Sequence, residues 1–289
     1  MYCPTIRGAG PTTTAAVTRY QNSGEIYATS GDTNGALMRI LPAGWAIPAT
    51  HARQRRDVVA RLTRVTHGAP VAVAAACAIA AMASYAVDGC AARELVTVAL
   101  REPGQVLGEH AAAAVPLQTV SAAADGSWRP GPAGVSLHAA ETLAAVVHVL
   151  AQRGDDLDGA VRYAVSLGGD TDTVASITAG ILGCRSAEPA IGWLDRVILP
   201  DPAELDRLAS GLRELRRARA MADCRACAIR TRPASVSTPN VRPASGPKCG
   251  SRTRWPPQTT VRSQRLPRPR RCRAQPGIAR RARQPRMHG

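Results

Sequence analysis

The chain is 289 residues long and 45% hydrophobic, a content that allows a sizeable core. Its composition is uneven. Residues 221–289 hold 17 of the 37 Lys and Arg residues, 10 of the 22 prolines and only one of the 21 acidic residues. The net charge of +16 therefore belongs to this part. We therefore expect one folded domain over residues 11–219 and a disordered, Arg- and Pro-rich low-complexity tail over residues 220–289.

The eight cysteines are scattered, and their spacing matches neither a disulfide framework nor a zinc site. The N-terminus lacks the charged and apolar regions of a signal peptide. The longest apolar run, residues 71–83, is too short to span a bilayer and predicts a core helix. We therefore expect a protein of the reducing cytoplasm without a membrane partner.

The first predicted helix covers residues 12–20 and stops at the polar residues 22–24. A polar turn over residues 30–35 then leads into an apolar helix. Within it, Asn34-Gly35 is a strong turn signal, and Gly35 would let a ligand approach the backbone closely. An ordinary capped helix start explains the same residues.

Apolar residues at helical spacing predict a helix over residues 55–66, which ends beside His67. A histidine at such a place is usually a favourable terminal charge or a core hydrogen-bonding group, and a ligand contact is the alternative. The next predicted helix, residues 69–87, is almost wholly apolar, so it should be buried at the centre of the domain.

Further helices are predicted over residues 91–100, over residues 135–150 and after Asp201, with a long irregular surface excursion over residues 104–134. No stretch alternates as a half-buried strand does, and no dinucleotide-binding or P-loop motif occurs. The fold class expected is all-α, a single domain of about eight helices that cross at angles.

The densest chemistry lies in Asp170-Thr171-Asp172-Thr173, between a Gly-Gly break and an apolar helix. A helix start offers free backbone N–H groups and favours negative charge. Oxygen ligands packed this closely suit Mg²⁺, Mn²⁺ or Ca²⁺, although three side-chain oxygens do not complete an octahedral shell. The alternative is that Asp170 is simply an N-cap and Asp172 a first-turn charge.

A family resemblance rests on three segments in this order: residues 31–39 (GDTNGALMR), Thr66-His67 and residues 167–173 (LGGDTDT). Over about residues 11–220 the chain resembles the ADP-ribosylglycohydrolase family, which includes dinitrogenase reductase-activating glycohydrolases and ADP-ribosyl-acceptor hydrolases. The resemblance implies an all-α domain with two Mg²⁺ ions, or Mn²⁺. It implies hydrolysis of the glycosidic bond between ADP-ribose and a protein side chain, so the expected partner is an ADP-ribosylated protein or a related conjugate.

The resemblance also implies roles for individual residues. Asp170, Asp172 and Thr173 would be metal ligands. Asp170 and Asp172 would also serve catalysis, together with Asp32 beside the reacting ribose. The residues expected to bind substrate are Asn34, Gly35, Met38, His67, Gly168 and Gly169.

The sequence departs from the family pattern at its N-terminus. The family's other metal half-site is a Thr-Asp-Asp-type motif near the N-terminus, whereas the first acidic residue here is Glu25 and the first aspartate is Asp32. We therefore expect a chain truncated at its N-terminus, with weak metal affinity and impaired hydrolysis.

Two other functions remain open from the sequence. A non-catalytic ADP-ribose-binding or structural relative could keep Asn34, Gly35 and Met38 without a complete metal site. Nucleic-acid binding through the basic tail is less favoured, because no aromatic stacking pattern accompanies the charge and because such tails also arise when a GC-rich gene is read out of frame. Nothing in the sequence indicates the oligomeric state.

Overall fold

The structure is a computed structural model that describes residues 10–107, 118–185 and 191–230. These residues lie in one compact unit, Met1–Ala234. Across the described ranges the regular elements are helices, with three isolated β-bridges and no β-strand, so the predicted all-α class is confirmed. The predicted disorder of the tail concerns residues that lie mostly outside the described ranges, and the domain boundary at residue 219 stays a prediction.

Eleven α-helices and three short 3₁₀ helices follow one another in these ranges. They are α1 (Pro11–Ser23), α2 (Gly35–Met38), α3 (Leu41–Ala46), η1 (Ala49–His51), α4 (Ala52–Arg64), α5 (Pro70–Val87), α6 (Ala92–Leu107), α7 (Thr119–Asp125), α8 (Ala139–Arg153), α9 (Leu157–Ser166), α10 (Thr171–Leu182), η3 (Gly183–Arg185), η4 (Leu194–Arg196) and α11 (Pro202–Arg230). The count exceeds the expected eight partly because the apolar helix expected after residues 30–35 is divided into α2 and α3, and because α7 lies where the sequence predicts an irregular excursion.

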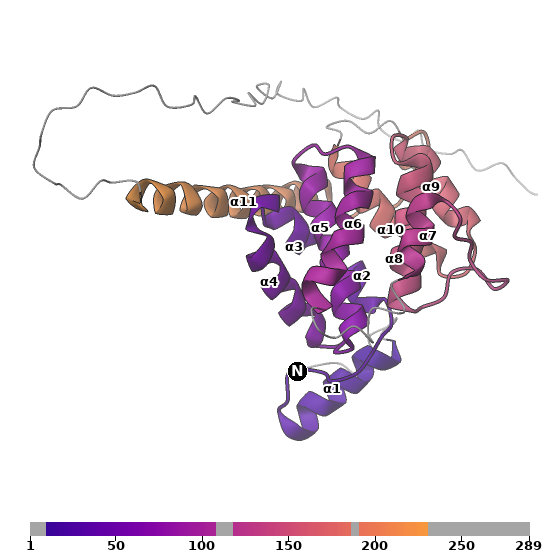
Figure 1. Ribbon diagram of the computed structural model, residues 1–289, viewed down its shortest axis with the longest axis horizontal. Coiled ribbons are helices and arrows are strands. Elements are labelled where there is room, and N and C mark those ends of the chain that lie inside the picture. The colour runs from indigo at the N-terminus through magenta and orange to yellow at the C-terminus, as the bar shows by residue number, and fades with distance from the viewer. Residues whose placement is uncertain (1–9, 108–117, 186–190, 231–289) are drawn as a thin grey trace, which may run out of the picture. The chain divides into compact units, whose positions relative to one another are not determined.

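Helix α5 is the centre of the fold, as its sequence predicts. It contacts α3, α4, α6, α8 and α10, and Figure 1 shows it beside α6 and α3. By length and composition α5 could cross a membrane, but 83% of its apolar window is buried inside the protein. Alanines make up much of the helix, and their small side chains let neighbouring helices approach closely.

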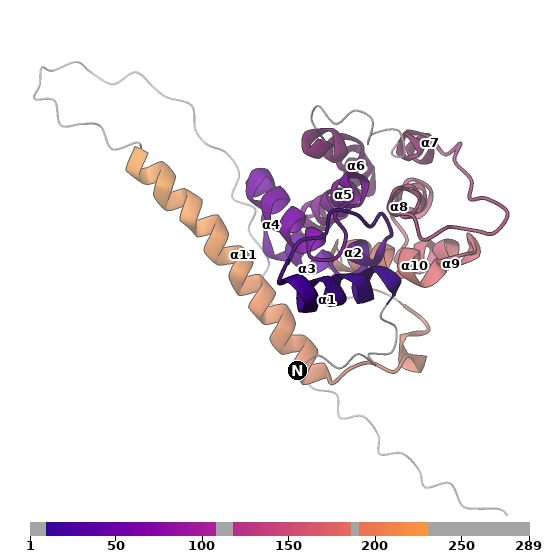
Figure 2. The same cartoon turned by 90° about the horizontal axis from the view of Figure 1, so that it is seen from below.

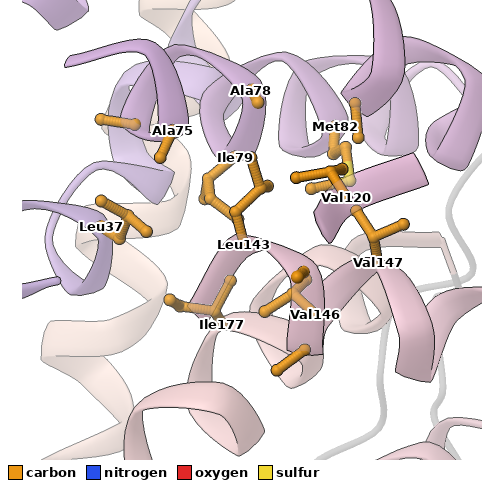
Figure 3. Packing of buried hydrophobic residues seen from close by; sticks show 14 of the residues in the cluster. Leu37, Ala75, Ala78, Ile79, Met82, Val120, Leu143, Val146, Val147 and Ile177 are labelled. Carbon is orange, nitrogen blue, oxygen red and sulfur yellow. The ribbon is translucent and has the colours of Figure 1, made fainter. Parts of the chain in front are cut away.

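Helix α8 extends the hydrophobic core from α5 to α7 and α9. It contacts α5 on one side and α7 and α9 on the other, an arrangement that Figure 2 shows in a second view. Figure 3 shows Ile79 of α5 next to Leu143 of α8, with Ile177 of α10 close by, and all three side chains are fully buried. This packing fixes the N-terminal ends of α8 and α10, where the candidate site lies.

Two sequence-based expectations are wrong in part. The irregular excursion expected over residues 104–134 contains the end of α6 and all of α7, because α6 continues through Pro103 to Leu107. Buried Glu102, which is paired with Arg55, holds this part of α6 in place despite the proline. The helix expected over residues 135–150 begins only at Ala139, because the residues before it pair with two other segments.

Helix α11 begins as predicted and extends past residue 219 to Arg230. It is anchored by Arg216, which donates hydrogen bonds to the carbonyl oxygens of Gly44, Trp45, Ile47 and Ser84 and to the carboxylate of Asp88. A guanidinium group placed at the C-terminal ends of α3 and α5 satisfies carbonyl groups that have no helical partner.

Candidate active site

The short extended segment 135–138, directly before α8, brings together the motif at residues 31–39 and the motif at residues 167–173. Residues 32–34 run antiparallel to it, with the Asn34 amide donating to the Leu137 carbonyl at 2.8 Å and the Ala139 amide donating to the Asp32 carbonyl at 2.9 Å. Residues 168–170 run parallel to its start, and the Asp170 amide donates to the Val135 carbonyl at 2.9 Å. The segment is therefore a template on which both motifs are fixed.

Asn34 and Asp170 meet directly on this template. The Asn34 amide nitrogen Nδ2 donates to Asp170 Oδ2 at 2.5 Å and to Thr142 Oγ1 at 2.8 Å. Asn34 and Thr142 are buried, whereas Asp170 is half-buried. Thr142 lies in the first turn of α8, and its part in the site follows from this contact.

Asp170 occupies the N-cap position of α10, but its side chain makes no capping hydrogen bond. Its other oxygen, Oδ1, accepts a hydrogen bond from Thr173 Oγ1 at 3.0 Å, and the Thr173 hydroxyl also lies 3.2 Å from the sulfur of Met38. The motif therefore turns the Asp170 carboxylate toward other side chains, which a simple N-cap would not do.

Glycines make the pairing of residues 168–170 with segment 135–138 possible. Gly168 and Gly169 have φ angles of +74° and +71°, and a Cβ atom on Gly169 would lie 2.2 Å from the Val135 carbonyl oxygen. Gly134 has a φ of +81°, and its Cβ would meet the Gly168 carbonyl carbon at 2.1 Å. Only glycine fits at these positions.

His67 is buried under the turn that carries Asn34. Its Nε2 atom lies 3.0 Å from Thr33 Oγ1 and its Nδ1 atom 2.7 Å from Thr66 Oγ1. Burial lowers the pKa of His67 to about 4, helped by the Arg39 cation and opposed by the Asp32 carboxylate. The imidazole is therefore neutral at pH 7.

Asp32 lies at the exposed edge of the same turn, with 59% of its side chain accessible. Its carboxylate is 3.8 Å from His138 Nε2. His138 is the N-cap of α8 and accepts a hydrogen bond from the Ala140 amide through Nδ1, so in the neutral ring the proton is on Nε2 and faces Asp32. His138 is not among the predicted site residues, because nothing in the neighbouring sequence marks a helix start there.

The two carboxylates of the motif influence each other. Burial raises the pKa of Asp170, and the neighbouring Asp172 adds to the rise, whereas hydrogen bonds from Asn34 and Thr173 oppose it. Asp172 is exposed, and its contact with Asp170 lowers its pKa. A cation between two such carboxylates would relieve their repulsion.

The donor set of the site fits a hard cation only in part. Two carboxylates and the Thr173 hydroxyl lie together, but among the described residues no group of three or more His, Cys, Asp or Glu side chains gathers in one place. Mg²⁺ is often bound by one or two carboxylates and completes its shell with water and substrate. Among the described residues, Asp170, Asp172 and Thr173 therefore supply only part of the ligand shell of one such ion.

Two cavities lie among the described helices. One, of about 320 Å³, borders the turn and is lined by Arg39, Ile40, Leu62, Val65 and Thr66. The other, of about 430 Å³, lies between the start of α6 and the end of α8 and contains none of the predicted site residues. The larger of these two cavities therefore lies away from the predicted site residues.

Comparisons with known proteins show what the chain is similar to. The family model described as ADP-ribosylglycohydrolase matches residues 4–222. The chain is 26% identical over 227 residues to the uncharacterized protein YegU of Escherichia coli (strain K12), covering 73% of this chain and 68% of YegU. It also resembles a solved structure titled "ADP-ribosylglycohydrolase-related protein complex", with a TM-score of 0.58, 29% identity and coverage of 71% of this chain and 69% of the other.

Proposed function

This chain belongs to the ADP-ribosylglycohydrolase family, and on that premise we propose that it is a metal-dependent hydrolase. The bond cleaved is the glycosidic bond between ADP-ribose and a protein side chain or a related conjugate. Water is added across this bond, so the hydroxyl group goes to the ribose carbon and a proton to the released side chain. The observation that carries the proposal is the contact between Asn34 and Asp170.

The metal part of the proposal rests on the donor set. Asp170, Asp172 and Thr173 would hold Mg²⁺, or Mn²⁺, through oxygen atoms at the start of α10. When bound, the ion would orient the ribose diol and lower the pKa of a water molecule. Because the described side chains supply only part of a ligand shell, we propose a weakly held ion whose shell is completed by water and substrate.

The remaining residues would bind and orient the substrate. Asn34 is pre-oriented by Thr142 and Asp170, so its side chain does not have to be ordered when ADP-ribose binds. Gly35 and Met38 follow in α2, and Met38 is 49% exposed next to Thr173. The exposed Asp32 carboxylate would accept a hydrogen bond from a ribose hydroxyl, and Gly168 and Gly169 would let the ligand approach the backbone.

A second candidate is ADP-ribose binding without catalysis. It is favoured by the small number of carboxylates that gather among the described residues. The same substrate-binding residues would serve in both cases, but only the hydrolase needs a divalent ion. Metal dependence therefore separates the two functions.

The test is release of ADP-ribose from peptides modified on arginine or on serine, measured with Mg²⁺ and with EDTA. We expect Mg²⁺-dependent release that Asp170→Asn abolishes and that Asp57→Asn, a change of an exposed aspartate on α4, leaves unchanged. ADP-ribose binding without release from either peptide supports the second candidate. Release that is insensitive to EDTA contradicts the metal-dependent mechanism.

A further inference from the structure

Five side chains form a continuous series of hydrogen bonds beneath the Asn34 turn. Arg39 Nη2 lies 2.5 Å from Thr66 Oγ1, and Thr66 Oγ1 lies 2.7 Å from His67 Nδ1. On the other side of the ring, His67 Nε2 lies 3.0 Å from Thr33 Oγ1, which lies 3.2 Å from Thr12 Oγ1. This series of hydrogen bonds runs from the end of α2, past the end of α4, to α1.

Arg39 determines which atom donates in each of these hydrogen bonds, because a guanidinium group only donates hydrogen bonds. Thr66 accepts from Arg39, so its own proton is free to be donated to His67 Nδ1. The ring proton is then on Nε2, which donates to Thr33. The opposite tautomer would leave the hydroxyl proton of buried Thr66 without an acceptor, at the cost of a buried unmade hydrogen bond.

The ring is also held by packing. A Cβ atom on Gly35 would lie 3.1 Å from His67 Cε1, so the turn rests directly on the imidazole. The backbone next to His67 is bonded to the same turn, with the Gly68 amide donating to the Ser30 carbonyl at 2.8 Å. His67 itself is only 1% exposed. Both ring nitrogens are engaged, so neither is available to a ligand.

We propose that His67 is a positioning residue, which as the neutral Nε2–H tautomer holds Thr33 and thereby aims the adjacent Asn34 at Asp170. Its influence on the substrate passes through Asn34 and involves no contact of its own. This inference rests on the proposed function for its consequence in ADP-ribose binding. The tautomer and the placement of Asn34 do not depend on any ligand.

The first test reads the protein without ligand. Nitrogen-15 NMR of the full chain distinguishes the two tautomers, and the His67→Gln spectrum assigns the signal among the six histidines. We expect Nε2–H at pH 7, and we expect the Asn34 side-chain amide signal to shift in His67→Gln and in the milder Thr66→Val but not in the control His51→Gln. An Nδ1–H or protonated His67, or an Asn34 signal unmoved by either variant, overturns the proposal.

The second test is a double-mutant cycle for ADP-ribose affinity, measured by calorimetry. Loss of one positioning hydrogen bond should weaken binding roughly tenfold in His67→Gln. Because His67 acts through Asn34, the double variant with Asn34→Ala should bind no more weakly than Asn34→Ala alone. Additive losses would show a contact that His67 makes by itself and would refute the proposal. Absence of ADP-ribose binding by the unmodified chain would refute the proposed function, while the NMR test would still decide the role of His67.

Discussion

Asn34 and Asp170 are 136 residues apart in the sequence, yet the Asn34 amide donates a hydrogen bond of 2.5 Å to the Asp170 carboxylate. The two side chains come from different motifs, and both motifs are fixed to the extended segment before α8. A small change in that segment would therefore move one half of the site relative to the other.

Asn34→Asp should destabilise the fold, because it places a second carboxylate against Asp170 in a buried position and removes the donor that Thr142 uses. We expect a loss of about 2–3 kcal/mol in the free energy of unfolding at pH 7. The loss should shrink at pH 4, where one carboxyl of the pair takes up a proton and donates again. Urea unfolding at both pH values measures this, with Asn22→Asp on the exposed face of α1 as the control. Equal losses at pH 7 and pH 4 would show that charge repulsion is not the cause.

Gly169→Ala should disrupt the template, because its Cβ would lie 2.2 Å from the Val135 carbonyl oxygen and its φ is +71°. We expect a loss of more than about 2 kcal/mol in stability. Gly104→Ala is the matched control, since Gly104 lies in α6 with nothing within 4 Å of its Cβ position, and it should be neutral or stabilising by about 0.5–1 kcal/mol. Thermal unfolding distinguishes the two, and similar melting temperatures for both variants would contradict the steric account.

Glu102→Gln tests the buried ion pair that holds α6 against α4. The side chains of Arg55 and Glu102 are only 1% and 9% exposed and lie 3.2 Å apart. Removing the negative charge leaves the Arg55 cation buried without a counter-charge, which should cost about 3–5 kcal/mol. Glu204→Gln breaks an exposed pair with Arg207 and should change stability by less than about 0.5 kcal/mol. Chemical denaturation of both variants gives the comparison, and a mild effect at Glu102 would mean that water reaches the pair.

The depressed pKa of His67 predicts how stability depends on pH. The folded state holds His67 neutral down to about pH 4, whereas the unfolded chain takes up its proton near pH 6.5. The stability contributed by the neutral ring is therefore complete above about pH 6.5 and falls as the pH drops toward 4, by at most about 3–4 kcal/mol. His67→Gln should flatten this part of the profile relative to the unmodified chain. Parallel profiles for the two proteins between pH 7 and pH 4 would show that His67 does not titrate as described.

The sequence predicts that the two motifs lie at a turn and at a helix start, although ordinary capping explains the same residues. Gly-Gly followed by Asp-Thr-Asp-Thr at a helix start, and Asn34-Gly35 in a turn, are local patterns that read the same in the folded chain. Helix α5 is predicted as a buried central helix because its residues are almost wholly apolar, while its longest apolar run, residues 71–83, is too short to span a bilayer.

The template and its neighbours could not be predicted in the same way. Residues 135–138 are extended because they pair with Gly169 and Thr33, and this pairing is a property of distant segments. Thr142 and His138 acquire their roles from those contacts alone. Helix α6 continues past Pro103 because tertiary contacts of Glu102 override a local signal.

The central claim is that the start of α10 binds a divalent ion, and direct titration with Mn²⁺ followed by electron paramagnetic resonance tests it most directly. The account predicts saturable binding by the full chain that strengthens when ADP-ribose is present, because substrate oxygens complete the shell. Asp170→Asn should abolish this binding and Asp57→Asn should leave it intact. Undiminished Mn²⁺ binding by Asp170→Asn would contradict the account.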